Sequence, residues 1–157
     1  GIAALSVHLR TLAEMSKVPA HWELASEVAA LGRAYRTPVL GNGDVATIAE
    51  ARQKAAAHGL DGVMLGRAIF GNPWRFNPKV RKEDLPLETV LAVLLEHATL
   101  YDALYGQIKP FEPLRKHFAS YLSGFSHIKP LRRRLTQSAG LGDVRAAVED
   151  WLGAGVG

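Results

Sequence analysis

PVLGNGDVATIAEA, residues 38 to 51, joins a short apolar run to a glycine-rich turn and the start of a helix. Because the residue before a proline favours an extended backbone, Pro38 opens a strand that we expect over Thr37 to Leu40. A strand, a glycine turn and a helix in this order direct backbone N–H groups and the positive end of the helix at one point. This geometry suits a phosphate group, so phosphate binding is the first functional hypothesis.

The helix after this turn is marked at both ends. Thr47 and Glu50 have the spacing of a capping box, in which a hydroxyl and a carboxylate each accept a hydrogen bond from a backbone N–H group at the start of a helix. Gly59 stands where a C-terminal cap is expected. These signals predict a helix that ends just before Gly59.

The alternation of strand and helix extends beyond this stretch. Apolar runs of strand length occur at Ala3 to His8 and at Gly62 to Leu65, and a helical pattern covers His21 to Leu31. On that helix Trp22, Leu24 and Leu31 are among the residues expected on the apolar side. Repeated strand and helix patterns are typical of a parallel sheet, so the fold class is α/β.

The pattern changes between Asn72 and Pro86, where three prolines and a run of charges end the alternation. Only helical signals follow. We therefore expect two domains, residues 1–76 and 77–157, of which the second is small and all-α. Its expected helices are Leu87–Tyr105, Pro113–Leu122, Pro130–Ser138 and Asp143–Leu152.

Composition and charge restrict the possible classes of protein. The 157 residues are 48% hydrophobic and carry a formal charge of +4, which permits a polyanionic partner without requiring one. The sequence has no cysteine, which excludes disulfides, zinc thiolate sites and a thiol nucleophile within it, and we expect no metal. The apolar run Val90 to Leu95 is far too short to cross a bilayer, so we expect a cytoplasmic protein without a membrane partner.

Two glycine turns follow consecutive strands: Gly41-Asn42-Gly43-Asp44 and Gly66-Arg67. In one interpretation Gly41, Gly43 and Ala46 form a dinucleotide fingerprint, and Arg67 holds the 2′-phosphate of NADP. In the other, the turns form the phosphate site of a (β/α)8 TIM barrel, of which the chain holds the last three βα units. The opening GIAALSVHL, with no initiator Met and an early strand whose edge must be covered, favours the barrel.

Polar side chains at the end of the first strand point to the same site. His8 ends that strand, and Arg10 follows closely. In a barrel His8 faces the ring system of a bound cofactor, although a lone histidine after an apolar strand is also often structural. Arg10 is equally suited to a ligand contact and to a salt bridge at the barrel rim.

A basic segment runs from Lys109 to Arg134 and contains a single acid, Glu112. Such a segment is typical of a surface that binds folded RNA, although a solvated helix face has the same composition. Helical spacing assigns Phe118, Tyr121 and Leu122 to packing and leaves the cations for RNA contact. These cations are Lys109, Arg115, Lys116, Lys129, Arg132, Arg133 and Arg134.

Nearly the whole chain resembles the tRNA-dihydrouridine synthases, which are FMN-dependent barrel enzymes with a helical tRNA-binding domain. Five segments carry the resemblance in order: VHLRT (Val7–Thr11), Pro-Ala-x-Trp (Pro19–Trp22), PVLGNGD (Pro38–Asp44), DGVMLGRAIFGNPW (Asp61–Trp74) and RKHFASYLSG (Arg115–Gly124). The fourth segment is the most specific of the five.

The resemblance implies a reaction and a set of binding residues. NADPH reduces FMN, and the reduced flavin reduces a flipped-out uridine of tRNA to 5,6-dihydrouridine. The FMN phosphate and ribityl end are held by the backbone and side chains of Asn42, Gly43 and Asp44, together with Gly66 and Arg67. His8 contacts the flavin, and Trp22 stays structural.

The chain departs from the family pattern at several positions. Leu9 stands where the family usually has glycine, so the turn must fit a bulky side chain, and Ser120 and Ser123 replace an expected Trp and Lys. The proton-donating cysteine and a flavin-contacting lysine of the family lie in segments upstream of those present here. The resemblance therefore implies that this chain supplies no catalytic residue, needs the remainder of the barrel and is inactive alone.

Two other functions are compatible with the same residues. Other FMN or NADP oxidoreductases with phosphate-binding α/β folds share the two glycine turns, but they would not explain the basic helical segment. A non-catalytic RNA-binding remnant would explain that segment, and an upstream part containing the cysteine would exclude it.

Overall fold

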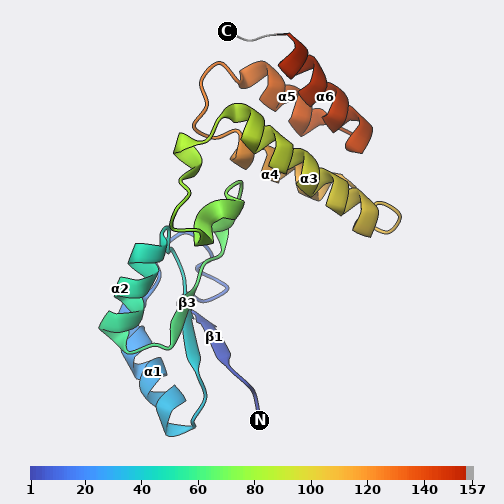
Figure 1. Ribbon diagram of the computed structural model, residues 1–157. Coiled ribbons are helices and arrows are strands. Elements are labelled where there is room, and N and C mark those ends of the chain that lie inside the picture. Colours follow the sequence, from blue (N-terminus) through green and yellow to red (C-terminus); the bar gives the residue numbers. More distant parts are fainter. Residues whose placement is uncertain (155–157) are drawn as a thin grey trace. The chain divides into compact units, whose positions relative to one another are not determined.

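The computed structural model describes residues 1–154, so the last three residues of the expected helical domain, 155–157, lie outside the described residues. Contacts divide the chain into two compact units, Gly1–Ile69 and a second unit that begins at Phe70 (Figure 1). We call them the sheet unit and the helical unit. Within residues 1–154, no helix is both long and apolar enough to span a membrane.

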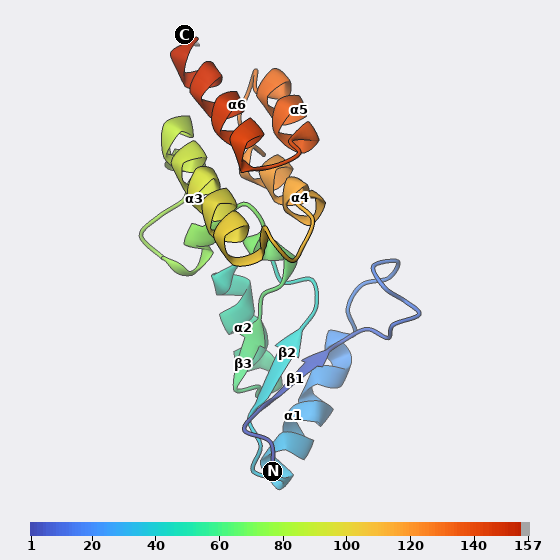
Figure 2. The same ribbon diagram turned by 90° about the vertical axis from the view of Figure 1, so that its right-hand side faces the viewer.

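The sheet unit contains three parallel strands in the order β1-β2-β3 (Figure 2). They are β1 (Leu5–His8), β2 (Val39–Asn42) and β3 (Gly62–Met64). The register pairs His8 with Asn42 and Asn42 with Met64, so all three strands end at the same edge of the sheet. The expected parallel α/β arrangement is confirmed, although β2 begins and ends two residues later than the Thr37 to Leu40 run.

Helices of the sheet unit pack on one face of the strands. After the short 3-10 helix η1 (Trp22–Leu24) come α1 (Ala25–Ala34), α2 (Ile48–His58) and the 3-10 helix η2 (Arg67–Ile69). α1, α2 and β2 contribute side chains to the same buried cluster. Side chains alternate along a strand, so every second residue points to the opposite face of the sheet. Met64 of β3 points to that face and is 48% exposed.

The expected apolar side of the first helix is partly wrong. Leu24 and Leu31 are 50% and 55% exposed. The reason is that η1 breaks the helical phase before α1 begins, so Ala25, Ala29 and Gly32 form the buried side instead. Gly32 permits the close packing on β2, because a Cβ atom there would lie 2.8 Å from the Thr37 carbonyl oxygen.

The predicted caps of α2 are confirmed, with one difference. The Thr47 hydroxyl accepts the Glu50 N–H at 3.1 Å, and Gly59 adopts the left-handed conformation with φ of 64°. The Glu50 carboxylate accepts the N–H of Ala46 at 2.9 Å, one residue before the position that a standard capping box uses.

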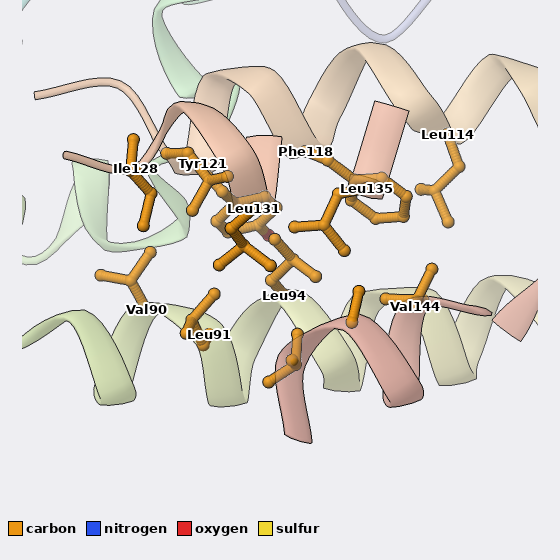
Figure 3. Close-up of a cluster of buried hydrophobic side chains, with 14 of the residues drawn as sticks. Val90, Leu91, Leu94, Leu114, Phe118, Tyr121, Ile128, Leu131, Leu135 and Val144 are labelled. Atoms are coloured by element: carbon orange, nitrogen blue, oxygen red, sulfur yellow. The ribbon is translucent and has the colours of Figure 1, made fainter. Parts of the chain in front are cut away.

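Between residues 70 and 154, the helical unit contains two short 3-10 helices followed by four longer helices. They are η3 (Pro73–Phe76), η4 (Lys82–Asp84), α3 (Leu87–Tyr105), α4 (Glu112–Tyr121), α5 (Lys129–Gln137) and α6 (Leu141–Gly153). Figure 3 shows apolar side chains of α3 directed toward those of α4 and α5 in a single buried core. All four helices were predicted, and their observed ends differ from the prediction by at most two residues.

The division between the units falls after Ile69, whereas the sequence predicted it after residue 76. Residues 70–76 pack on the helical unit, which explains the difference. The Phe70 ring lies edge-on to His117 at 4.9 Å between centroids, and Trp74 packs against the helical core. Gly71, with φ of 66°, approaches the backbone of α4 so closely that a Cβ atom would collide with Ser120.

Candidate phosphate-binding site

The ends of the three parallel strands, with the turns that follow β2 and β3, form one hollow of about 130 Å³. Six of the predicted site residues line it: His8, Asn42, Gly43, Asp44, Gly66 and Arg67. They come together because parallel strands end at a common edge, which is where ligands bind in α/β sheets. Arg10, the seventh predicted residue, lines an adjacent hollow together with His8 and Arg67.

Position 43 requires glycine because of its backbone conformation. Its φ of +141° is strained for other residues, and a Cβ atom would lie 2.7 Å from the Ala20 methyl group. The Gly43 carbonyl accepts a hydrogen bond from the indole Nε1 of buried Trp22 at 3.0 Å. Trp22 therefore supports the turn from inside the core, as expected for a structural residue.

Gly41 serves packing instead. A Cβ atom at this position would lie 2.8 Å from Leu60 and 3.0 Å from the Trp22 ring, so the residue faces the core below the helices. The first glycine of the candidate dinucleotide fingerprint thus accommodates an indole ring and a leucine. This placement argues against the dinucleotide interpretation, in which the glycines let the backbone approach a pyrophosphate.

Asn42 and Leu9 fix the strand ends relative to one another. The Asn42 side-chain amide donates to the Met64 carbonyl at 2.8 Å, and the Leu9 N–H donates to the Asn42 carbonyl at 2.8 Å. Leu9 itself is 5% exposed, so the bulky side chain at the usual glycine position packs into the core. His8 remains exposed at the rim of the hollow.

The Asp44 carboxylate joins three segments of the sheet unit. It accepts hydrogen bonds from Arg10 Nη2, from the Ala20 N–H at 3.1 Å and from Arg67 Nη2 at 3.2 Å. The hydrogen bond from Arg10 is the largest of the effects that lower the pKa of Asp44. Asp44 therefore carries its negative charge between two guanidinium groups.

The two arginines of this ion-pair group differ in exposure. The Arg10 side chain is 5% exposed, and its Nε donates to the Val18 carbonyl at 2.6 Å. The Arg67 side chain is 65% exposed, and its Nη1 donates to the Ser16 hydroxyl at 3.2 Å. Arg10 forms a salt bridge, one of its two predicted roles, and its predicted ligand contact stays a prediction, whereas Arg67 presents its charge to solvent.

Sequence reasoning did not identify Ser16, Val18 or Ala20. All three lie in the irregular loop between β1 and η1, which extends away from the strands (blue, Figure 2). A loop without periodicity contains no signal for long-range contacts. The Pro-Ala-x-Trp segment at Pro19 to Trp22 was the only indication that this loop carries a constraint.

A histidine and two carboxylates brace this loop. His21 lies 2.8 Å from Glu14 and 3.0 Å from Glu23, and the Thr11 N–H donates to Glu14 at 2.7 Å. The hydrogen bonds from Thr11, and then from His21, lower the pKa of Glu14 to about 2. The hydrogen bonds to Glu14, and then to Glu23, raise the pKa of His21. Protonation of the imidazole and ionisation of the two carboxylates therefore favour one another.

In the helical unit, the predicted RNA-binding cations differ in exposure and in their hydrogen bonds. Five of the seven are exposed: Lys109, Lys116, Lys129, Arg133 and Arg134. Three of the seven, exposed Arg134 among them, donate hydrogen bonds within the unit. Arg115 Nε donates to the Ser138 carbonyl at 2.8 Å, Arg132 Nη2 to the Leu122 carbonyl at 3.0 Å and Arg134 Nη2 to Asp150 at 2.8 Å. The aromatic residues follow the prediction, since Phe118 and Tyr121 are 0% and 5% exposed.

One histidine of α3, His97, lies close to one histidine of α4, His117. The rings of His97 and His117 are 5.5 Å apart between centroids, and the Tyr121 hydroxyl lies 3.4 Å from His97 Nδ1. Burial lowers the pKa of both histidines. Across residues 1–154, no group of three or more histidine or acidic side chains is arranged to hold a metal ion.

Comparison with known proteins gives a consistent result along the chain. The family model described as Dihydrouridine synthase (Dus) matches residues 1–153. The chain is 40% identical over 153 residues to "Probable tRNA-dihydrouridine synthase 2" of Bacillus subtilis (strain 168), covering 96% of this chain and 46% of that protein.

Two staphylococcal relatives are similar to a lesser degree. "Probable tRNA-dihydrouridine synthase" of Staphylococcus aureus (strain MRSA252) is 35% identical over 153 residues, covering 96% of this chain and 46% of that protein. The protein of the same name from Staphylococcus epidermidis (strain ATCC 12228 / FDA PCI 1200) is 34% identical over 151 residues, covering 94% and 46%. The chain thus spans about half the length of the curated relatives it matches.

Proposed function

The chain belongs to the dihydrouridine synthase family, and on that premise we propose that the protein containing it reduces uridine in tRNA to 5,6-dihydrouridine, with FMN as cofactor and NADPH as reductant. One observation carries the proposal beyond family membership. Six predicted site residues, from the ends of β1 and β2 and from the turns after β2 and β3, line one hollow. The relatives are named for the same activity.

The sheet unit is proposed to form the last three βα units of a TIM barrel. Three parallel strands in sequence order, with their helices on one face, fit that architecture. The uncovered face, with Met64 half exposed, would then line the barrel interior. The remaining strands and the proton-donating cysteine would come from an upstream part, and the present chain by itself is expected to be inactive.

The residues at the strand ends fit the phosphate of FMN. Arg10 and Arg67 carry two positive charges against the single carboxylate of Asp44, so this group has a net charge of +1 before ligand binding. The exposed Arg67 guanidinium can hold a phosphate by two hydrogen bonds. A Cβ atom at Gly66 would meet nothing within 4 Å, so the backbone there is open to approach.

Each residue would have a distinct task toward the cofactor. Arg67 and the backbone of Gly43, Asp44 and Gly66 would bind the phosphate, while Asn42 would hold the ribityl end. His8, exposed at the rim, would face the flavin ring. Bound FMN would supply the chemistry by taking a hydride from NADPH and passing it to C6 of the uracil ring.

The proposed contacts with tRNA are the four exposed cations of the predicted set that donate none of the hydrogen bonds described above. Lys109, Lys116, Lys129 and Arg133 can neutralise phosphates of the RNA backbone, which releases bound counterions and makes binding dependent on salt. A uridine inside a folded tRNA must leave its stack before it can lie against a flavin, so the enzyme must also hold the surrounding RNA. Because tRNA is the proposed substrate, we place the protein in the cytoplasm.

The test uses the intact protein that contains this chain. A purified sample should show a flavin absorption spectrum, release FMN on denaturation and lose its visible absorption with NADPH. Incubation with tRNA that lacks dihydrouridine should then produce this base, measured by mass spectrometry of digested nucleosides. A colourless protein that takes up no FMN but binds tRNA would instead indicate an RNA-binding protein without catalysis.

A further inference from the structure

Asp44 is poorly suited to contact a phosphate with its side chain. Its carboxylate carries a negative charge, held there by Arg10 and Arg67, and like charges repel at short range. Yet it lies in the turn that lines the hollow. A carboxylate at an anion site weakens anion binding by repulsion, unless it also positions a group that binds the anion.

The contacts of Asp44 indicate what that task is. Its Oδ2 accepts from Arg10 and from the Ala20 N–H, and its Oδ1 accepts from Arg67 Nη2 at 3.2 Å. The carboxylate therefore links the loop after β1, the turn after β2 and the turn after β3. Arg67 would otherwise be a long side chain with 65% of its surface exposed and many accessible rotamers.

Ser16 completes the arrangement around Arg67. Its hydroxyl accepts from Arg67 Nη1 at 3.2 Å, so the two terminal nitrogens of the guanidinium have separate partners. Ser16 lies in the loop that Asp44 fastens through Ala20. Asp44 thus acts on Arg67 directly and also through the loop that bears Ser16.

We propose that Asp44 is a positioning residue, which fixes the Arg67 guanidinium and the loop after β1 for a phosphate-bearing ligand and makes no side-chain contact with that phosphate. This inference rests on the proposed function for the identity of the ligand, FMN. Its structural part, the restraint of Arg67, does not depend on the ligand.

The sign of the change in anion affinity separates the two roles. If the Asp44 charge acts only by repulsion, then Asp44→Asn tightens the binding of an anion. If Asp44 positions Arg67, the same variant weakens it, and we expect about tenfold weaker binding of FMN and of inorganic phosphate to the flavin-free intact protein. In an Arg67→Met background, Asp44→Asn should cause no further loss, because its effect passes through Arg67.

A second measurement detects whether the Arg67 side chain is restrained, and it needs no ligand. In 15N-arginine NMR spectra of the intact protein, the Nη groups of Arg67 should give separate signals because rotation is slow, and Asp44→Asn should merge them. Asp84→Asn is the matched control, since it removes an exposed carboxylate that pairs with an arginine, Arg81, in the helical unit. It should leave both the Arg67 signals and the FMN affinity unchanged.

Asp44→Asn also leaves buried Arg10 with a weaker partner and can unfold the sheet unit. Ser16→Ala avoids this problem, because it removes one acceptor of Arg67 and leaves Arg10 untouched; we expect a two- to fivefold loss of FMN affinity. Averaged Arg67 signals in the wild type, or equal or tighter FMN binding in both folded variants, would overturn the inference. A wild type that restrains Arg67 but binds neither FMN nor phosphate would overturn the proposed ligand and leave the restraint established.

Discussion

Arg132 and Arg133 are adjacent in the sequence and have different surroundings. Arg132 is partly buried, and its Nη2 donates to the Leu122 carbonyl at the end of α4, whereas Arg133 is exposed on α5. The sequence analysis assigned both to RNA contact, because the sequence does not show that α5 packs where Arg132 reaches the end of α4. The same reason explains why the partners of Arg115 and Arg134 were not foreseen.

The two arginines should therefore respond differently to alanine substitution. Arg132→Ala removes a charged donor to the Leu122 carbonyl, which should destabilise the helical unit by about 1–3 kcal/mol in urea denaturation. Arg133→Ala should leave stability within about 0.5 kcal/mol and should weaken tRNA binding, with the salt slope reduced by about 1. Equal loss of stability in the two variants would contradict this division of the cations.

Gly43 and Gly66 offer a similar contrast at the candidate site. Gly43→Ala places a side chain at φ of +141° and 2.7 Å from Ala20, so it should cost about 1–3 kcal/mol of stability. Gly66→Ala enters open space at a position without positive φ, so stability should change by no more than about 0.5 kcal/mol. FMN affinity should nevertheless fall in Gly66→Ala, because the methyl group occupies the approach of the phosphate.

Calorimetry of both glycine variants, followed by FMN titration of Gly66→Ala, separates folding from binding. A stable Gly66→Ala protein with unchanged FMN affinity would remove Gly66 from the proposed site. A Gly43→Ala protein as stable as the wild type would mean that the turn relaxes without cost.

Individual helices and strands were predictable where their signals are local. The ends of α2 are set by Thr47 and Gly59, and the whole span of α3 follows from its apolar spacing. The phase of α1 was not predictable, because it begins after a 3-10 turn at Trp22, whose indole makes a long-range hydrogen bond to the Gly43 carbonyl. The seven strand-end residues could be named in advance because parallel strands end at one edge, whereas Ser16 and Ala20 reach that edge only through the fold of the loop.

The cap of α2 gives a test of the local signals. Thr47→Ala removes the hydroxyl that accepts the Glu50 N–H at 3.1 Å, and we expect a loss of about 1 kcal/mol in the unfolding of the sheet unit. Thr47→Ser keeps a hydroxyl in place and serves as the control, with a smaller effect. Hydrogen exchange in the first turn of α2 should rise in the alanine variant only. An equal rise in both variants would show that the methyl group, and not the cap, stabilises this turn.

Across the whole molecule, the two units keep separate cores and separate titrating histidines. The core of the helical unit draws on α3, α4, α5 and α6, and that of the sheet unit on β2, α1 and α2 (Figures 1 and 3). His21 belongs to the sheet unit, where its carboxylate partners raise its pKa. His97 and His117 belong to the helical unit, where burial lowers theirs.

These opposite shifts predict opposite responses to pH. The protonated His21 stabilises the sheet unit below the unfolded pKa of about 6.5, and this contribution is lost as the pH rises through the raised folded value. The neutral rings of His97 and His117 are compatible with their burial above about pH 6.5. That compatibility is lost as the pH falls through their lowered folded values.

Hydrogen exchange measured at pH 5.5 and 7.5, corrected for the intrinsic rate, should therefore show the loop after β1 better protected at the lower pH. The amides of α3 and α4 should be better protected at the higher pH. Glu14, with a pKa of about 2, stays charged across this range, so the loop response should follow His21 alone. The variant His21→Gln should abolish the pH response of the loop and leave that of α3 and α4 intact. The variant His97→Gln should reduce the pH response of α3 and α4 and leave that of the loop intact. If both units shifted in the same direction, or if His21→Gln left the loop response unchanged, the charged bridge between His21 and Glu14 would not be what braces the loop.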